Sequence, residues 1–408
     1  QHDSRNISML MDFYEMTMAH GYFTKQEEMD RVAFDVFFRR NPDKGGFAIF
    51  GGLEQIVEYI LNLHFDERDI AYLRDQGIFS DEFLDYLKDF SFKGDVYAFP
   101  EGSIIYPNEP VITIVAPLID AQIVETAVLT MMNHQSLIAT KANRIVRAAD
   151  GRVVADFGAR RAHNVDAAVY GARAAYIGGV GSTATVLAGQ QFGIPVSGTM
   201  AHSWVMYYGS EYDAFKAYAE VYPDNAVFLV DTYDVLNSGV PNAIQVAKDV
   251  LEPMGKRLKG IRLDSGDLAY LAKKARRMLD DAGLEDCKIM ASNSLDEYTI
   301  KSLLLQGGPI DIFGVGERLI TSKSDPVFGA VYKIASIEKD GKWEPRIKIS
   351  EAVEKITNPG LKKVYRVYNE KGRAIADLMT LLREVPDTEE PYRYINPEQP
   401  WRELYFEN

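Results

Sequence analysis

The feature that most constrains the fold is an alternation of short apolar strands with helical stretches between residues 152 and 330. The strand ends read VVADFG, IPVSGT, AVFLVDTYD, GIRLDSGD, KIMASNS and IDIFGVGE. Leu268, Leu271, Ala272, Ala275 and Leu279 show the helical spacing of one intervening stretch, and Gly283 is a natural stop for it. Six consecutive strand–helix units predict a parallel sheet, either doubly wound or closed into a barrel.

Polar residues follow nearly every one of these strands. They are Asp156 and Arg160, Thr199 and His202, Asp231 and Asp234, Arg262 with Asp264 and Asp267, Ser292 and Asn293, and Gly314 and Gly316. In a β/α barrel the carboxyl ends of all strands face one rim, so that all of these residues can converge on one pocket. A doubly wound sheet brings together only two or three strand ends, at its switch point. The pattern therefore favours a barrel with a functional rim.

The flanking regions differ in character and predict an accessory domain. Residues 50–90 show helical spacing, residues 94–117 alternate β-rich runs with turn formers, and residues 120–149 return to helical periodicity. After residue 330, YRVYNEKGRAIADLM predicts two strands joined by a turn. We expect an accessory α+β domain with a long connecting helix over 1–150, a catalytic α/β barrel over 151–330, and a segment over 331–408 that rejoins the accessory domain.

Composition excludes several classes of protein. No stretch approaches the roughly 20 unbroken apolar residues of a membrane helix, and the start lacks the pattern of a secretory signal. A net charge of -14 disfavours binding to nucleic acid or to an anionic membrane. A single cysteine, Cys287, cannot form an internal disulfide and is typical of a reducing compartment. We therefore expect a cytoplasmic protein without nucleic-acid or membrane partners.

Two segments after strand ends have the residues of an anion site. In FGARRAH, the aromatic face of Phe157 beside the guanidinium of Arg160 suits a flat anionic ring, although surface arginines paired with acids give the same pattern. In GIRLDSGDL, Arg262 and a Gly-containing turn suit a phosphate, and Asp264 suits sugar hydroxyls or Mg²⁺. Asp267 is also placed to cap the following helix.

Two glycines, Gly314 and Gly316, follow the last strand, where barrels commonly bind phosphate. A bare G-x-G is a weak signal, and the chain has no G-x-x-x-x-G-K-[ST] motif, so P-loop chemistry is not supported.

His202 is a lone histidine in GTMAHSW, for which a packed residue, a metal ligand or a reactive group are alternatives. The six histidines and one cysteine show no metal-ligand spacing, so no metal site built from histidine and cysteine is expected. His202 follows a strand end, and Asp231 or Asp234 one strand away can orient its second nitrogen. An imidazole whose tautomer is fixed in this way is a competent nucleophile.

Together these segments resemble the nicotinate phosphoribosyltransferase family, which makes nicotinate mononucleotide and pyrophosphate from nicotinate and phosphoribosyl pyrophosphate in NAD biosynthesis. The similarity runs through DFYEMTMAHGYF, FDVFFRRNP, DFGARRAH, GGVGSTATVLAG, GTMAHSW, LVDTYD, IRLDSGDL and GVGERL, in the order of the family. It implies an irregular (β/α) barrel of the type II phosphoribosyltransferase kind with an α+β accessory domain. The barrel agrees with the pattern of strands described above.

The resemblance also implies roles for individual residues. His202 matches the histidine that ATP phosphorylates, which implies a phosphohistidine, ATP as co-substrate and Mg²⁺ as cofactor. The other matches within the chain are Phe157 beside the nicotinate ring, Arg160 near its carboxylate, Ser182 and Thr183 in the ring-binding loop, and Arg262, Asp264, Gly314 and Gly316 around the phosphoribosyl group.

Two further matches imply a homodimer with shared active sites. Tyr14 matches an aromatic residue that stacks on nicotinate in the neighbouring subunit, opposite Phe157, and Arg40 (or Arg39) matches an arginine that reaches the phosphates from the partner chain. Composition alone carries no information about assembly.

Three alternative interpretations of the sequence remain. The first is a nicotinamide phosphoribosyltransferase, which shares the barrel, the histidine and the stacking pair. The second is a quinolinate-type enzyme, which works without ATP. A non-catalytic barrel that binds nucleotides is the third, although the charged residues of the rim disfavour it. The chain ends at Asn408 after PWRELYFEN, whereas family members carry further helical sequence, so we expect a shortened C-terminal region.

Overall fold

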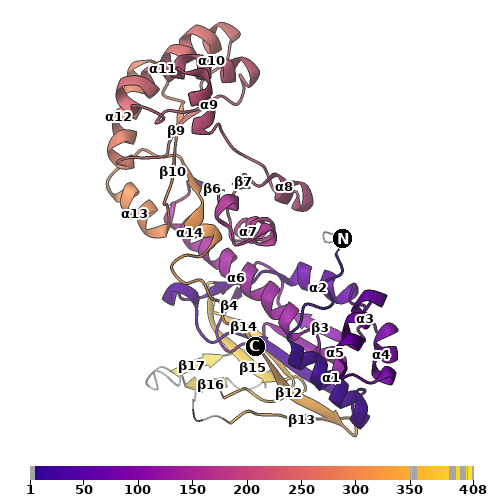
Figure 1. The fold of residues 1–408 in the computed structure, drawn as a ribbon. Coiled ribbons are helices and arrows are strands. Elements are labelled where there is room, and N and C mark those ends of the chain that lie inside the picture. Colours follow the sequence, from indigo (N-terminus) through magenta and orange to yellow (C-terminus); the bar gives the residue numbers. More distant parts are fainter. Residues whose placement is uncertain are drawn as a thin grey trace.

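The computed structural model describes residues 5–349, 351, 356–385, 392–395, 401 and 403–406. Figure 1 shows an accessory lobe that contains both sequence ends of the described chain and an elongated second lobe that carries the parallel strands. Each lobe has its own large hydrophobic core. The parts of the 331–408 prediction that fall on residues 350, 352–355, 386–391, 396–400, 402, 407 and 408 lie outside the described residues.

A five-stranded antiparallel sheet with the order β13-β12-β1-β5-β3 forms the centre of the accessory lobe. Its strands are β1 Arg31–Phe37, β3 Asp95–Ala98, β5 Ile112–Pro117, β12 Val331–Lys339 and β13 Lys342–Pro345. A small pair, β2 Ala48–Ile49 and β4 Ile104–Ile105, lies beside it. Because β12 pairs with β1, in the register Phe37↔Val331, the chain returns to its first strand after completing the barrel.

Helices surround this sheet and connect it to the second lobe. They are α1 Phe13–Lys25, η1 Pro42–Lys44, α2 Leu53–Leu61, α3 Glu67–Asp75, α4 Asp81–Lys88, α5 Leu118–Gln122 and α6 Glu125–Ala148. Helix α6 has buried residues along most of its length and contributes Met131 and Met132 to the accessory core and Ala142 and Ile145 to the barrel core. It is therefore the main packed connection between the lobes (Figure 1).

The second lobe confirms the predicted α/β fold. Its parallel strands are β6 Val153–Asp156, β7 Ser182–Thr183, β8 Val227–Leu229, β9 Gly260–Leu263, β10 Lys288–Ser292 and β11 Ile312–Val315. They pair in the order β7-β6-β11-β10-β9-β8, so that the last strand closes on the first. An isolated bridge between Thr183 and Val196 extends the sheet by one residue. No pairing joins Val196 to β8 within the described ranges, and the barrel is irregular at this seam.

The helices of this lobe follow the strands in chain order. They are η2 Ala159–Arg161, α7 Val165–Ile177, α8 Val186–Phe192, α9 His202–Tyr208, α10 Glu211–Val221, the π-helix η3 Val235–Gly239, α11 Val240–Val246, the π-helix η4 Ala247–Leu251, η5 Glu252–Met254, α12 Leu268–Asp281, α13 Glu297–Leu305 and α14 Glu317–Ile320. The N-terminus of α12 is capped as predicted, because the Asp267 carboxylate accepts from the Tyr270 N–H. Gly283 follows with a φ of 77°.

One predicted strand is wrong in extent. IPVSGT forms only the bridge at Val196, and the two-residue strand β7 lies in a segment for which only a loop was predicted. The Thr183 N–H donates to Pro195 O and the Ser197 N–H donates to Thr183 O. In a strand the N–H and C=O of one residue point to the same side. Pro195, whose C=O faces Thr183, therefore has no N–H with which to continue this pairing with β7.

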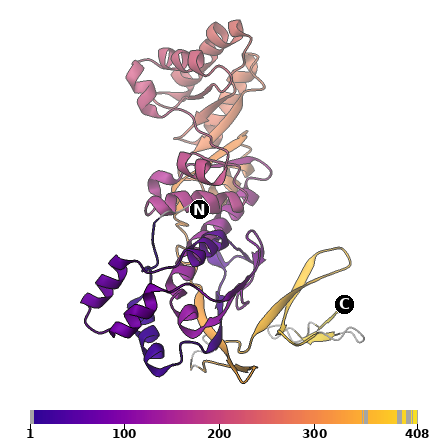
Figure 2. The same ribbon diagram turned by 90° about the vertical axis from the view of Figure 1, so that its right-hand side faces the viewer.

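The remaining C-terminal elements lie beside the accessory sheet. They are β14 Lys362–Tyr368, β15 Ala374–Leu381, β16 Tyr392–Ile395 and β17 Glu403–Phe406. Strands β14 and β15 form the predicted hairpin, which projects to one side in Figure 2. At its base, Lys362 Nζ lies 2.6 Å from Asp35 Oδ2 on β1, and both side chains are buried. Throughout the described part of the chain, every helix is too short or too polar to cross a bilayer.

Candidate active site

Side chains from the carboxyl ends of the parallel strands meet at one rim of the barrel. The pairing of the strands sets this arrangement, because Asp156 lies opposite Val315, Gly314 opposite Ser292, and Ala291 opposite Leu263. Residues that follow these positions emerge at the same end of the sheet. Of the predicted residues, the rim brings together Phe157, His202, Asp231, Arg262 and Asp264.

Arg262 is the most connected side chain of the rim. Its guanidinium donates to Thr199 Oγ1 at 2.8 Å through Nη1 and to Ser292 Oγ at 3.0 Å through Nε. Nη2 lies 3.4 Å from Asp264 Oδ1. The guanidinium carbon also lies 5.6 Å from the centre of the Phe157 ring, within cation–π range. These contacts fix the position and orientation of the Arg262 guanidinium, and thus of its positive charge, at the rim.

Phe157 is close to this arginine and to two glycines. A Cβ added to Gly314 would lie 2.6 Å from two carbons of the Phe157 ring, and one added to Gly316 would lie 3.2 Å from Phe157 O. The Phe157 N–H donates to Val315 O at 2.8 Å, and this hydrogen bond holds the backbone of Phe157 against β11. Of the two glycines that the sequence placed at a phosphate site, Gly314 therefore leaves the space in which the aromatic ring packs, and Gly316 leaves space for the backbone of Phe157.

His202 begins helix α9, with 40% of its side chain exposed. Its Nδ1 lies 3.0 Å from Thr232 Oγ1. Its Nε2 lies 3.8 Å from Asp231 Oδ1 and 3.8 Å from Asp264 Oδ2. Hence one ring nitrogen contacts a hydroxyl, and the other faces two carboxylates.

Asp234, the alternative partner predicted for His202, serves another purpose. Its carboxylate accepts from the N–H groups of Leu236 and Asn237 and caps the π-helix η3. These hydrogen bonds lower the pKa of Asp234, beginning with the bond from the Asn237 backbone. The hydroxyl of Thr232, which sequence reasoning missed, is the side chain that contacts Nδ1. The segment LVDTYD does show this hydroxyl, because Thr232 directly follows Asp231, one of the two carboxylates predicted to orient His202.

Asp231 is a deeply buried carboxylate of the rim, with 1% of its side chain exposed. Its Oδ2 accepts from the Asp264 N–H at 2.9 Å and from the Ser265 hydroxyl at 2.6 Å. Its Oδ1, which faces His202, has no hydrogen-bond partner among the described residues. A buried carboxylate oxygen is rarely left without a partner, so this atom is available to a ligand or to a cation.

Asp264 is the second carboxylate that faces His202, and it also contacts Ser292 at the end of β10. Its Oδ1 accepts from Ser292 Oγ at 2.5 Å, and its Oδ2 faces His202. The two aspartates thus present one oxygen each toward the same nitrogen. Such a donor set fits Mg²⁺, which usually takes one or two protein carboxylates together with phosphate oxygens and water. Within the described ranges, histidine, cysteine and acidic side chains form no cluster of three that could hold a metal by themselves.

Three predicted ring-site residues lie on the β6 and β7 side. Arg160 is on η2, exposed, and makes no hydrogen bond or ion pair with any residue that the structure describes. Ser182 Oγ lies 2.6 Å from Ser197 Oγ. Thr183 is buried and donates to Asp156 Oδ2 at 2.7 Å, and burial raises the pKa of Asp156. Thr183 is therefore a buried residue that holds the Asp156 carboxylate, whereas the side chain of Arg160 is exposed and accessible to a ligand.

The structure does not bring Tyr14 and Arg40 to this rim. Helix α1 lies in the accessory lobe (Figure 1). Its Tyr14 is exposed, as are Leu10, Phe13 and Met18. Arg40 follows β1 and makes a bidentate contact with Asp325 at 2.6 and 2.9 Å. The guanidinium of Arg39, the alternative to Arg40, lies over the ring of Phe37.

Three family models match consecutive parts of the chain. They are described as the nicotinate phosphoribosyltransferase N-terminal domain, over residues 9–133, the nicotinate phosphoribosyltransferase family, over 153–371, and the nicotinate phosphoribosyltransferase C-terminal domain, over 361–408. Together these matches span nearly all of the sequence.

Individual proteins give the same picture. The nicotinate phosphoribosyltransferase of Bacillus subtilis is 48% identical over 395 residues, which cover 96% of this chain and 80% of the relative. The crystal structure of human nicotinic acid phosphoribosyltransferase is 28% identical, covers 97% of this chain and 86% of the human chain, and superposes with a TM-score of 0.83. That of a nicotinate-nucleotide pyrophosphorylase from Pyrococcus furiosus is 26% identical, with coverages of 94% and 86% and a TM-score of 0.73.

Proposed function

Because this chain belongs to the nicotinate phosphoribosyltransferase family, we propose that it transfers the phosphoribosyl group of phosphoribosyl pyrophosphate to nicotinate and couples this transfer to ATP through a phosphohistidine at His202. The products are nicotinate mononucleotide and pyrophosphate. The observation that carries the ATP-coupled part is the position of His202, whose imidazole faces two carboxylates at the barrel rim.

The transfer step requires the rim to stabilise charge. Departure of pyrophosphate leaves an oxocarbenium-like ribosyl carbon, which the pyridine nitrogen of nicotinate attacks. Arg262 supplies a fixed positive charge for the phosphate oxygens, and Asp264 lies where it can accept from ribose hydroxyls. Phe157 offers one face to the nicotinate ring, and its packing on Gly314 holds that face in place. Arg160 is accessible for the nicotinate carboxylate.

Asp231 and Asp264 are the residues that would hold Mg²⁺. Bound there with substrate phosphates, the ion supplies neutralisation of the charge on pyrophosphate and on the phosphate groups of ATP. The residues of the chain set the position of the imidazole: Thr232 contacts Nδ1, and the orphan Oδ1 of Asp231 lies on the side of Nε2. Phosphate on His202 adds negative charge beside this pair, which would favour recruitment of the cation and, only through that cation, of phosphoribosyl pyrophosphate.

Mass spectrometry after incubation with ATP and Mg²⁺ tests the proposal. We expect one phosphate on His202, its loss in the His202→Ala variant, and its retention in His64→Ala, which removes an exposed histidine of the accessory lobe. We also expect turnover of His202→Ala to lose its stimulation by ATP. Stimulation by ATP that is equal in the wild type and in His202→Ala contradicts the role of His202.

The choice of substrate is tested separately. We expect turnover with nicotinate to exceed turnover with nicotinamide, and we expect the Arg160→Ala variant to raise the KM for nicotinate more than that for nicotinamide. Equal turnover of acid and amide would instead support the nicotinamide enzyme. A cytoplasmic location belongs to the same proposal, since the single cysteine is typical of a reducing compartment.

We further propose a homodimer in which Tyr14 and Arg40 complete the site of the partner. The exposed apolar residues of α1 support this proposal, because a patch of this kind marks an interaction surface. Mixing the Tyr14→Ala and His202→Ala variants, neither of which should show the ATP-stimulated activity, tests it through that activity. Shared sites predict that the mixture regains part of the activity, since hybrid dimers contain one intact site. A mixture that stays as inactive as its components, in a protein that sediments as a dimer, contradicts the sharing.

A further inference from the structure

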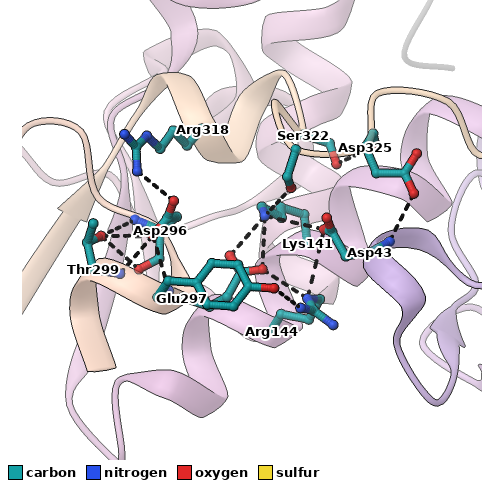
Figure 3. A network of polar contacts seen from close by, with 11 residues as sticks. Asp43, Lys141, Arg144, Asp296, Glu297, Thr299, Arg318, Ser322 and Asp325 are labelled. Carbon is teal, nitrogen blue, oxygen red and sulfur yellow. Dashed lines mark hydrogen bonds and ion pairs between the residues drawn. The ribbon is translucent and has the colours of Figure 1, made fainter. Parts of the chain in front are cut away.

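A buried lysine joins three turns that are far apart in the sequence. The ammonium group of Lys141 on α6 donates to Ser324 Oγ at 2.7 Å, to Glu297 Oε1 at 3.0 Å and to Asp43 Oδ2 at 3.3 Å. These three contacts use all three of its hydrogens. Only 2% of the Lys141 side chain is exposed, and 8% of that of each carboxylate. Figure 3 shows this network, with Arg144 beside it as the second cation.

Backbone strain is concentrated around this network. Nine residues other than glycine have a positive φ in the described part of the chain, and five of these lie within four residues of Asp43, Glu297 or Ser324. The five are Asp43, Lys44, Asn293, Ser294 and Ser322. Left-handed conformations of such residues persist only where surrounding contacts enforce them, and they gather at functional sites. The network supplies such contacts to three strained turns at once.

One of these turns leads directly to the candidate active site. Asn293 and Ser294, with φ of 78° and 53°, follow Ser292, whose hydroxyl contacts both Arg262 and Asp264. The turn ends at Asp296, which caps α13 and pairs with Arg318 on α14 at 2.6 Å. Glu297, the next residue, is the partner of Lys141. The Lys141 network therefore anchors the chain immediately after β10.

The opposite side of the network leads to Arg40. Asp325, next to Ser324, binds the Arg40 guanidinium through both oxygens and accepts from the Asp43 N–H at 3.0 Å. The buried Ser322 hydroxyl donates to Asp325 O at 3.0 Å. The arginine proposed to reach the phosphates of the partner site is thus held by the same network that anchors the rim after β10.

Stability alone does not account for this arrangement. Removing two carboxylates and a lysine from water costs about as much as their mutual attraction returns, so that buried ion pairs of this kind add little net stability. Such a network instead constrains geometry, because moving one member away leaves a buried charge without its partner. The network fixes two segments, and both lie next to residues assigned above to the phosphoribosyl group.

We propose that Lys141 and Glu297 form a buried positioning centre, which holds the 293–294 turn and the Arg40 segment in place and so sets the affinity for phosphoribosyl pyrophosphate. The inference rests on the proposed function for the identity of that substrate. Lys141 and Glu297 touch no substrate themselves and act through the segments that they hold. The nicotinate ring is proposed to bind against Phe157, which has no direct contact with Lys141 or Glu297, so we expect its binding to change much less.

The test compares Lys141→Met with a matched control. Lys362→Met removes a lysine with 6% of its side chain exposed that pairs with buried Asp35, but between β14 and β1, away from the rim. Steady-state kinetics and calorimetric binding of phosphoribosyl pyrophosphate are measured well below the melting temperature of each variant. We expect Lys141→Met to raise the KM and the Kd for phosphoribosyl pyrophosphate by about tenfold or more, with the KM for nicotinate within about twofold of wild type. Lys362→Met should lower only the melting temperature.

Glu297→Gln provides a second variant that keeps the shape of the side chain while removing its charge. We expect Glu297→Gln to raise the KM for phosphoribosyl pyrophosphate several-fold. If Lys141→Met does not fold, this variant alone tests the proposed positioning role. The proposal is overturned if the folded variants bind phosphoribosyl pyrophosphate as wild type does, if both KM values rise by the same factor, or if Lys362→Met has the same effect. Formation of nicotinate mononucleotide by the wild type tests the proposed function independently, and the binding measurement needs no turnover.

Discussion

The packing of Phe157 on Gly314 yields a sharp prediction for the Gly314→Ala variant. The added Cβ would lie 2.6 Å from two ring carbons, whereas carbon atoms pack favourably at about 3.5–4.0 Å. The ring must therefore move by about 1 Å. This movement changes the contact of the ring with the guanidinium of Arg262, whose carbon lies 5.6 Å from the ring centre.

The size of the effect follows from the contacts that change. Overpacking of this kind costs about 1–3 kcal/mol, which for a domain of this size lowers the melting temperature by about 2–10 °C. Displacing the ring also removes aromatic stacking worth about 0.5–1.5 kcal/mol from the proposed nicotinate site. Since 1.4 kcal/mol corresponds to a factor of about ten, the KM for nicotinate should rise by about 2- to 12-fold.

The assay measures nicotinate mononucleotide by chromatography at varied nicotinate and saturating phosphoribosyl pyrophosphate, beside thermal unfolding. Gly46→Ala is the matched control, because a Cβ at Gly46 meets no atom within 4 Å and Gly46 has no positive φ. We expect this control to keep the melting temperature and both KM values of wild type.

Two results would refute the reasoning. A folded Gly314→Ala enzyme with an unchanged KM for nicotinate would show that the Phe157 ring does not carry the nicotinate site. A rise in the KM for phosphoribosyl pyrophosphate alone would instead support the phosphate-binding role that the sequence pattern predicts for Gly314.

Three further predictions follow from buried groups. Burial raises the pKa of Glu15 from 4.5 to about 7, so the folded chain holds this proton more tightly than the unfolded chain does. The resulting stabilisation is complete below the unfolded pKa and is lost as the pH rises through 7. In Glu15→Gln, the fall in unfolding free energy from about pH 5 to 8 should therefore be smaller than in wild type by about 2–3 kcal/mol, measured with urea, and an unchanged fall contradicts the assignment. Burial likewise raises the pKa of the Cys287 thiol to about 12, so an aromatic disulfide reagent should label it only after unfolding; rapid labelling of the native protein would contradict its burial. A Cβ at Gly239 would lie 1.8 Å from Val230 O, and Gly239→Ala should lose at least about 3 kcal/mol in a chemical unfolding curve, whereas Gly21→Ala, with no atom within 4 Å, should lose nothing.

The sequence predicted the convergence of Arg262, Asp264, Asp231 and His202, because the carboxyl ends of parallel strands share one edge. It did not identify which side chain contacts His202. Successive residues after a strand point in different directions, so that a shift of one position exchanges Asp231 for Thr232, and a shift of two exchanges Asp234 for Thr232. That choice depends on the π-helix η3, whose cap occupies Asp234, and no periodicity in the sequence indicates a π-helix.

Contacts between the lobes were also beyond the reach of sequence patterns. Lys141 lies in a helix that could be predicted, but its partners are 98, 156 and 183 residues away. The same holds for Gly314, which reads as part of a phosphate loop until the ring of Phe157 is placed against it. Tyr14 and Arg40 came from the family resemblance alone, and a single chain leaves both away from the rim.

The pairing of β12 with β1 has a consequence for synthesis of the chain. Strand β1 emerges from the ribosome early, yet the strand that covers one of its edges, Val331–Lys339, is made only after the whole barrel. During that interval one edge of β1 lacks its native partner, and an open strand edge is a template for pairing with other chains. The accessory sheet therefore matures last although its first strand is made first, and a nascent chain halted within the barrel is the species that most needs a chaperone.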